Sequence, residues 1–188
     1  MLFRLAYRLT DQRALIDADA KRWGEVQGHA GELRRLVRLA EFRSLLYHRL
    51  SHGNQVGRIY SGVLRRVRPG ERTLFLTTNS IGPGLFIQHG FATIVSAQSV
   101  GANCWINQQV TIGFDETLRA PVIEDGARVH AGAIVLGPVN VGRDAIVGAG
   151  AVVTKDVPAG MVAVGVAATC RAPGHSAQVS AQRAEAVG

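Results

Sequence analysis

The sequence has few cysteines, no long hydrophobic run and too few acidic residues to balance the basic residues of its first half. Cys104 and Cys170 are the only cysteines of 188 residues, too few for a disulfide framework and without the spacing of a zinc site. No run of about 18 apolar residues occurs, and the first residues do not follow the pattern of a signal peptide. We therefore expect a soluble, cytoplasmic protein with one moderate core.

Charge is distributed unevenly along the chain. Residues 1–72 contain 15 Lys and Arg against 7 Asp and Glu, whereas residues 73–188 contain 6 against 7. A basic half can bind nucleic acid or an anionic membrane. Here the arginines are interspersed with Leu and Val at helical spacing, and few aromatic residues accompany them. We expect no nucleic-acid partner, and two alternatives stay open: a solvated helical face, or weak contact with an anionic membrane surface.

A six-residue repeat runs through residues 81–164, with one seven-residue step after Ile87 and an interruption at residues 113–120. The repeating aliphatic residues are Ile81, Ile87, Ile94, Val100, Ile106, Ile112, Ile123, Val129, Val135, Val141, Val147 and Val153. Neither a helix of period 3.6 nor a strand of period 2 produces this spacing. A coil with three faces does, because each face uses one short strand and one turn. The repeat predicts a left-handed parallel β-helix of about four coils with an outward loop at 113–120.

The segment before the repeat has a different pattern. Residues 31–52 carry Leu and Val at helical spacing, which predicts an amphipathic helix or helix pair that ends at Gly53 and Asn54. Residues 55–72 predict a second short helix. The expected fold is mainly β: a small helical N-terminal segment (1–72), a β-helix (73–172) and a loosely ordered tail (173–188).

Four strings stand in a fixed order along the chain. They are Glu41-Phe-Arg-Ser-Leu-Leu-Tyr-His-Arg-Leu, Ile81-Gly-Pro-Gly-Leu-Phe-Ile-Gln-His, Gln109-Val-Thr-Ile-Gly and Gly148-Ala-Gly-Ala-Val-Val-Thr-Lys-Asp-Val-Pro. In this order they resemble the serine acetyltransferase branch of the hexapeptide-repeat acyltransferases, including its relatives in capsule and exopolysaccharide gene clusters. The resemblance implies a homotrimeric enzyme that binds acetyl-CoA in grooves between subunits and uses a histidine to activate an acceptor hydroxyl.

His89 is the candidate general base. The family motif Ile-Gly-x-Gly-hydrophobic-x-hydrophobic-x-His ends on the catalytic base, and His89 ends the matching string here. An alcohol attacks a thioester slowly until a base removes its proton, and a neutral imidazole is suited to that task near pH 7. The attack also creates an oxyanion, which backbone N–H groups can stabilise. A purely structural histidine is the alternative interpretation.

The resemblance also implies a binding wall for the pantetheine arm of acetyl-CoA. Ala131 and Ala149 match the family positions whose backbone forms hydrogen bonds with the arm. Gly148 has no side chain that would keep the arm away from the backbone. Lys155 matches the lysine that meets the phosphates of CoA, with Arg171 as a second candidate. The alternative for Lys155 is an ordinary exposed lysine.

The chain departs from the serine acetyltransferase pattern around the acceptor. The family Asp before the catalytic His is Gln88, its second His is Ala120, and residues 73–80 contain no carboxylate. Recognition of an amino acid needs charged partners in a dry cleft, because unpaired buried charges are costly. We therefore expect the acceptor to be a sugar of a polysaccharide or glycolipid precursor, with serine as the alternative.

Other polar residues and two rival functions complete the sequence-based hypotheses. Asp115, Glu116 and Arg119 of the loop are candidates for substrate contacts, and His130 is a second polar candidate or a bystander. A β-helical carbonic anhydrase needs three histidines, but only His89 and His130 lie in the coil, so we expect no metal site. A non-catalytic trimeric scaffold fits the lost Asp and second His, but it would not need a CoA wall.

Overall fold

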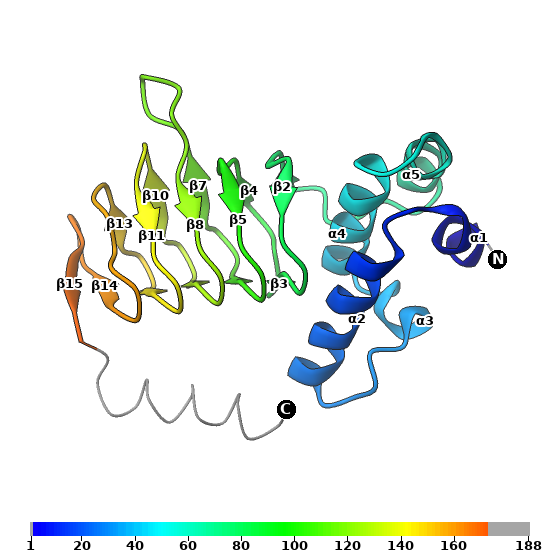
Figure 1. Ribbon diagram of the computed structural model, residues 1–188, viewed down its shortest axis with the longest axis horizontal. Helices are drawn as coiled ribbons and strands as arrows, with labels where there is room; N and C mark the ends of the chain where they lie inside the picture. Colours follow the sequence, from blue (N-terminus) through cyan, green and yellow to red (C-terminus); the bar gives the residue numbers. More distant parts are fainter. Residues whose placement is uncertain (1, 173–188) are drawn as a thin grey trace.

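The structure is a computed structural model that describes residues 2–172. Within them, five helices at one end lead into a coil of short strands at the other (Figure 1). The helices are α1 (Leu2–Leu9), α2 (Arg13–Gln27), α3 (Leu33–Leu36), α4 (Ala40–Ser51) and α5 (Gln55–Val67). The tail that the sequence predicts to be loosely ordered, 173–188, lies outside the described residues.

The strands run from β1 to β15 and form three sheets. They are β1 (Leu74–Leu76), β2 (Ser80–Ile81), β3 (Phe86–Ile87), β4 (Thr93–Val95), β5 (Ser99–Val100), β6 (Trp105–Ile106), β7 (Thr111–Gly113), β8 (Val122–Ile123), β9 (Arg128–Val129), β10 (Ile134–Leu136), β11 (Asn140–Val141), β12 (Ile146–Val147), β13 (Val152–Val153), β14 (Val162–Val164) and β15 (Thr169–Arg171). Sheet A has the order β1-β4-β7-β10-β13, sheet B the order β11-β8-β5-β2, and sheet C the order β15-β14-β12-β9-β6-β3.

This arrangement is a parallel β-helix, which confirms the predicted fold class. Every pairing is parallel except the last, between β14 and β15. The 5-stranded sheet A gives about five rungs, one more than the repeat predicts. The extra rung begins at β1, before the first hexad, where Leu74 to Leu76 pair in register with Thr93 to Val95.

The hexad residues form the core of the coil. On sheet C, Ile87 pairs with Ile106, Ile106 with Val129, and Val129 with Val147, so the same inward position repeats on successive rungs. Each of these side chains is at most 1% exposed. Full burial of such a side chain contributes about 1.5–3 kcal/mol relative to exposure. The aliphatic period is therefore explained by stacking of identical positions.

Helices α2 and α4 cover the first rung of the coil. The Trp23 indole N–H donates to the Leu85 carbonyl at 2.8 Å, and its ring packs against those of Phe42 and Phe86. This aromatic cluster closes the end of the apolar core that the first rung would otherwise expose.

A buried ion pair ties the same helices to the coil. Arg49 of α4 donates to both carboxylate oxygens of Asp19 of α2, at 2.8 and 3.0 Å, and both side chains are almost fully buried. The guanidinium also donates to the carbonyls of Ile81 and Gly82. Asp19 in turn accepts from the Gly84 N–H at 2.8 Å. The pair therefore fixes the turn that precedes β3.

The helical segment differs in detail from its prediction. The expected helix or helix pair at 31–52 is a pair, α3 and α4, and Arg43 donates to the carbonyls of Val37 and Arg38 between them. Helix α5 ends at Val67, earlier than expected, because Pro69 follows. Helices α1 and α2 had no predicted counterpart. Among residues 2–172, no helix is both long and apolar enough to cross a membrane.

Candidate active site

One corner of the coil gathers most of the predicted site residues. It lies between sheets C and A, where β3, β6, β9 and β12 each end in a turn. Backbone hydrogen bonds connect the turns of neighbouring rungs: Gln109 N–H to the Phe91 carbonyl, Gly132 to Gln108, and Gly150 to Ala131, at 3.0, 3.1 and 2.9 Å. We call this edge the histidine corner, because its first turn carries His89.

The seven-residue step of the repeat is located at His89. The turn between Ile87 and Ile94 contains one residue more than the turn between Ile106 and Ile112 on the next rung. Because the Gln109 N–H donates to the Phe91 carbonyl, the two turns are back in register there, and the extra residue lies at His89 or Gly90. Both residues have a positive φ, 65° and 63°. This region is costly for a histidine, and such conformations concentrate at functional sites. The exposed His89 side chain thus stands on a widened turn.

The residues next to His89 on sheet C are held by a side-chain bond between rungs. The Asn107 amide donates to the Gln88 amide oxygen at 3.0 Å, so Gln88 is fixed against the second rung. The Asn107 oxygen is buried and has no partner among the described residues. His130 follows on the third rung, where burial and then Arg128 lower its pKa, so its imidazole is neutral at pH 7. Its polar role stays a prediction.

A carboxylate-bearing side chain from the helical segment lies against this corner. A Cβ built on Gly90 would lie 3.1 Å from the Cγ of Glu41, which belongs to the first turn of α4. Glu41 is half-buried. Sequence reasoning missed it, because the search for a carboxylate covered only residues 73–80. The available signal was its position at the start of the first family-like string.

The predicted CoA wall lies on the same corner, beyond the second rung. Ala131 and Ala149 occupy equivalent places on the next two rungs, with glycines on either side of Ala149. Among the described residues, neither the Ala131 nor the Ala149 N–H donates a backbone hydrogen bond. Both groups are therefore free to donate to an extended chain of amides. The structure brings Ala131, Gly148 and Ala149 onto the edge that carries His89.

Lys155 and the outward loop lie on the opposite edge of sheet A. The loop follows β7 and projects from the coil (Figure 1), and Lys155 follows β13 on the same edge. Asp115 accepts from the Thr117 side chain and N–H, and these bonds lower the pKa of its carboxyl. Arg119 donates to the Thr117 hydroxyl at 2.9 Å, while Glu116 is exposed. Within one chain, the strands of sheet A separate this edge from His89.

Arg171 lies further away, in β15 at the end of the coil. Its strand pairs antiparallel with β14, and Arg171 is exposed opposite Val162. Its predicted help in binding phosphate stays a prediction, as do the roles of the other site residues.

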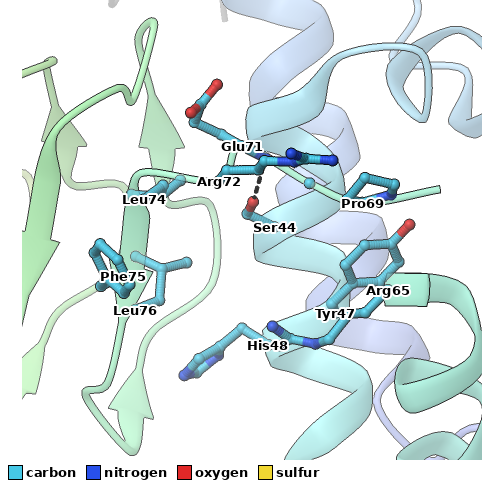
Figure 2. A pocket seen from close by; sticks show the side chains of 11 residues that line it. Ser44, Tyr47, His48, Arg65, Pro69, Glu71, Arg72, Leu74, Phe75 and Leu76 are labelled. Carbon is cyan, nitrogen blue, oxygen red and sulfur yellow. Dashed lines mark hydrogen bonds between the residues drawn. The ribbon is translucent and has the colours of Figure 1, made fainter.

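A separate pocket lies where α4, α5 and β1 meet (Figure 2). Its volume is about 260 Å³. Tyr47, His48 and Arg65 line it from the helices, and Ser44 accepts from the Glu71 N–H at 2.9 Å at its rim. None of the predicted site residues lines this pocket. In residues 2–172 no group of three or more His, Cys, Asp or Glu is placed to hold a metal ion.

Comparison with known proteins adds the family. A family model described as bacterial transferase hexapeptide (six repeats) matches residues 120–155. The serine acetyltransferase of Helicobacter pylori is 33% identical over 142 residues, which cover 66% of this chain and 77% of that protein. That of Bacillus licheniformis is 36% identical over 117 residues, 60% of this chain, and the match spans only 50% of the longer relative.

A solved structure agrees with these relatives. The serine acetyltransferase of Neisseria gonorrhoeae, in complex with serine, superposes with a TM-score of 0.67 at 26% identity, over 89% of this chain and 73% of that one. The fold and the repeats place the chain among the hexapeptide-repeat transferases. Within this class, the chain belongs to the serine acetyltransferase family.

The sugar acceptor expected from the sequence is wrong, because the matching relatives and structures are serine acetyltransferases. The expectation depended on Gln88 and Ala120 in place of the family Asp and second His, and on the absence of a carboxylate from residues 73–80. The fold brings Glu41 to Gly90 from a distant helix, so residues 73–80 do not contain the whole surroundings of the site.

Proposed function

We propose that this protein transfers the acetyl group of acetyl-CoA to the hydroxyl of serine. One observation carries the proposal: a widened turn presents His89 on the same corner as a wall of small residues with free N–H groups. Family membership supports serine as the acceptor, since a relative of similar fold is known in complex with serine.

His89 acts as the general base in this proposal. Its imidazole would accept the proton of the serine hydroxyl as the oxygen bonds to the thioester carbonyl carbon. When the carbon–sulfur bond breaks, the imidazolium would return the proton to the departing sulfur. The products are O-acetylserine and the free thiol of CoA, so atoms and charge balance.

The wall of the histidine corner suits the pantetheine arm. The arm is extended and carries amides, and the free N–H groups of Ala131 and Ala149 lie on consecutive rungs, about 4.8 Å apart. Gly148 and Gly150 add no side chain between them, so the arm can approach the backbone. When bound, acetyl-CoA supplies the activated acetyl group and the thiol leaving group.

Glu41 is our candidate partner for the ammonium group of serine. It lies against Gly90, directly after His89, and no hydrogen bond or ion pair of its carboxylate is found among the described residues. In this proposal the Glu41 carboxylate would hold the amino end of serine and thus aim its hydroxyl at the imidazole.

We also propose a homotrimer with shared active sites. The histidine corner and the edge that carries the loop and Lys155 flank sheet A on opposite sides, so contact between subunits is the way to join them. The outer face of sheet A supports such contact, because Phe75 and Ile94 are neighbours there and are 54% and 41% exposed.

Thiol release from acetyl-CoA in the presence of serine tests the activity. We expect His89→Ala to lower kcat by roughly 10²–10⁴-fold, with thermal unfolding unchanged, whereas His29→Ala in the helical segment retains activity. Glu41→Gln is expected to raise KM for serine while leaving KM for acetyl-CoA unchanged. Turnover by His89→Ala at the wild-type rate would exclude His89 as the base. Absence of both acetylation and CoA binding in the wild type would favour the scaffold alternative.

Mixing of two variants with lowered activity tests the shared site. If Lys155 of one subunit serves the His89 of its neighbour, co-refolded His89→Ala and Lys155→Ala chains should regain part of the wild-type activity. Activity that stays at the level of the separate variants would place each site within one chain.

A further inference from the structure

The helices farthest from the coil form an exposed end of the molecule. Helices α1 and α5 pack side by side there (Figure 1). Asn54 joins them, since its side chain donates to the Leu9 carbonyl at 2.9 Å and accepts from the Gly57 N–H at the start of α5. The two helices are therefore joined at this end of the molecule.

Each helix exposes a stripe of large apolar side chains. In α1, Leu2, Leu5 and Leu9 are 40–46% exposed, whereas Ala6 is buried. Their spacing of three and four residues places them on one side of the helix. Ala6, four residues after Leu2 and three before Leu9, is buried, so the stripe borders the contact of α1 with the interior.

Helix α5 repeats the arrangement. Val56, Ile59, Val63 and Val67 are 38–69% exposed and are also three and four residues apart, while Ser61 and Leu64 face the interior. Exposed apolar stripes on two neighbouring helices are unusual for a face in contact only with water.

Exposed arginines lie on the same two helices. Arg4 and Arg8 are exposed on α1, and Arg58 and Arg66 are exposed on α5. Neither helix contains Asp or Glu. Arg65 is left out, because its guanidinium lies over the Tyr47 ring at 5.6 Å. We call the two stripes and these four arginines the basic docking face.

We propose that the basic docking face binds the surface of an anionic lipid bilayer. Amphipathic helices of this composition lie in the interface, with apolar side chains among the acyl chains and cations at the headgroups. A second copy of the chain is a poorer occupant. It would bring the arginines of two faces together, and no carboxylate on α1 or α5 is available to neutralise them.

Sedimentation of the full chain with vesicles tests the proposal. We expect binding to vesicles of phosphatidylcholine with phosphatidylserine to exceed binding to phosphatidylcholine alone by about ten-fold or more, and to weaken as salt rises. This test does not depend on catalytic activity, so its failure leaves the proposed function unaffected.

Matched control variants test whether vesicle binding depends on the basic docking face rather than on the overall charge or hydrophobicity of the protein. Arg66→Gln, next to the stripe of α5, should lower binding about five-fold, whereas Arg143→Gln on the coil should not change it. Ile59→Ser should lower binding roughly ten-fold, whereas Leu118→Ser, on the exposed outward loop, should not. All four positions are exposed, so thermal unfolding is expected to match the wild type.

Two results would overturn the proposal. One is equal sedimentation with neutral and anionic vesicles, or none with either. The other is self-association in the absence of lipid that Ile59→Ser weakens in analytical ultracentrifugation, since the face would then bind a second copy.

Discussion

The coil and the helical segment are stabilised by different kinds of contact. In the coil, the same apolar position stacks on every rung, and stabilisation is spread over many equivalent contacts. The helical segment depends on a few buried polar groups that reach the first rung, above all the pair of Arg49 and Asp19. Loss of one group should therefore matter more in the helical segment than loss of a similar group in the coil.

The ion pairs of the two regions give the largest expected difference. Arg49→Met leaves the buried Asp19 carboxylate without its charged partner, and we expect the free energy of unfolding to fall by roughly 3–5 kcal/mol. Arg143→Met removes an exposed pair of the coil, where the Arg143 and Asp125 side chains are 68% and 52% exposed, and should cost about 0.5 kcal/mol or less.

Urea unfolding of both variants measures this difference. The double variant Asp19→Leu/Arg49→Met should recover part of the loss, because it removes the unpaired charge. Equal costs for Arg49→Met and Arg143→Met would contradict the contrast between the two regions.

A histidine of the helical segment should make stability depend on pH. Burial, aided by His52 and Arg49, lowers the pKa of His48 from the ordinary 6.5 to about 4, against the effect of its bond to the Thr78 carbonyl. The unfolded chain therefore binds the proton at higher pH than the folded chain, and stability falls as pH drops below about 6.5. We expect a loss of about 2 kcal/mol between pH 7 and 5.

Thermal or urea unfolding at the two pH values tests this expectation. His48→Gln, which can still donate to Thr78, should lose about 2 kcal/mol less than the wild type over the same interval. His29→Gln should keep the wild-type dependence. An unchanged pH dependence in His48→Gln would show that another group titrates.

Two glycines give the smallest expected effect, with opposite signs in the two regions. In α5, a Cβ at Gly62 would meet nothing within 4 Å, so Gly62→Ala should stabilise the protein by about 0.5–1 kcal/mol. In the coil, Gly160 is equally open but has a φ of +69°, so Gly160→Ala should destabilise by about 1 kcal/mol. If both substitutions shifted the melting temperature in the same direction, the positive φ of Gly160 would not explain the expected difference between the two glycines.

The two regions also differ in how far the sequence predicts them. The six-residue repeat predicts the coil, because each rung places the same residue type in the same surroundings, as at Ile87, Ile106 and Val129. The helical segment has no such repetition. Its boundaries depend on contacts such as Arg43 with the carbonyls of Val37 and Arg38, which local sequence does not encode.

The candidate site shows the same limit. His89, Ala131 and Ala149 were found from motifs within the coil, and the fold places them on one edge. Glu41 was missed and the acceptor was predicted wrongly, because its contact with Gly90 joins segments that are far apart in the chain. A motif identifies the residues of one segment, whereas the surroundings of a site come from several.

The spacing of the rungs fixes distances along the histidine corner. Its rungs are spaced by about 4.8 Å, so the distance from the base to any point along the wall is a whole number of steps set by the backbone. From the turn of His89 to that of Ala149 there are three steps, or about 14 Å. Side-chain substitutions cannot change this length, whereas insertion of one complete rung would lengthen it by a fixed amount and leave each local contact intact.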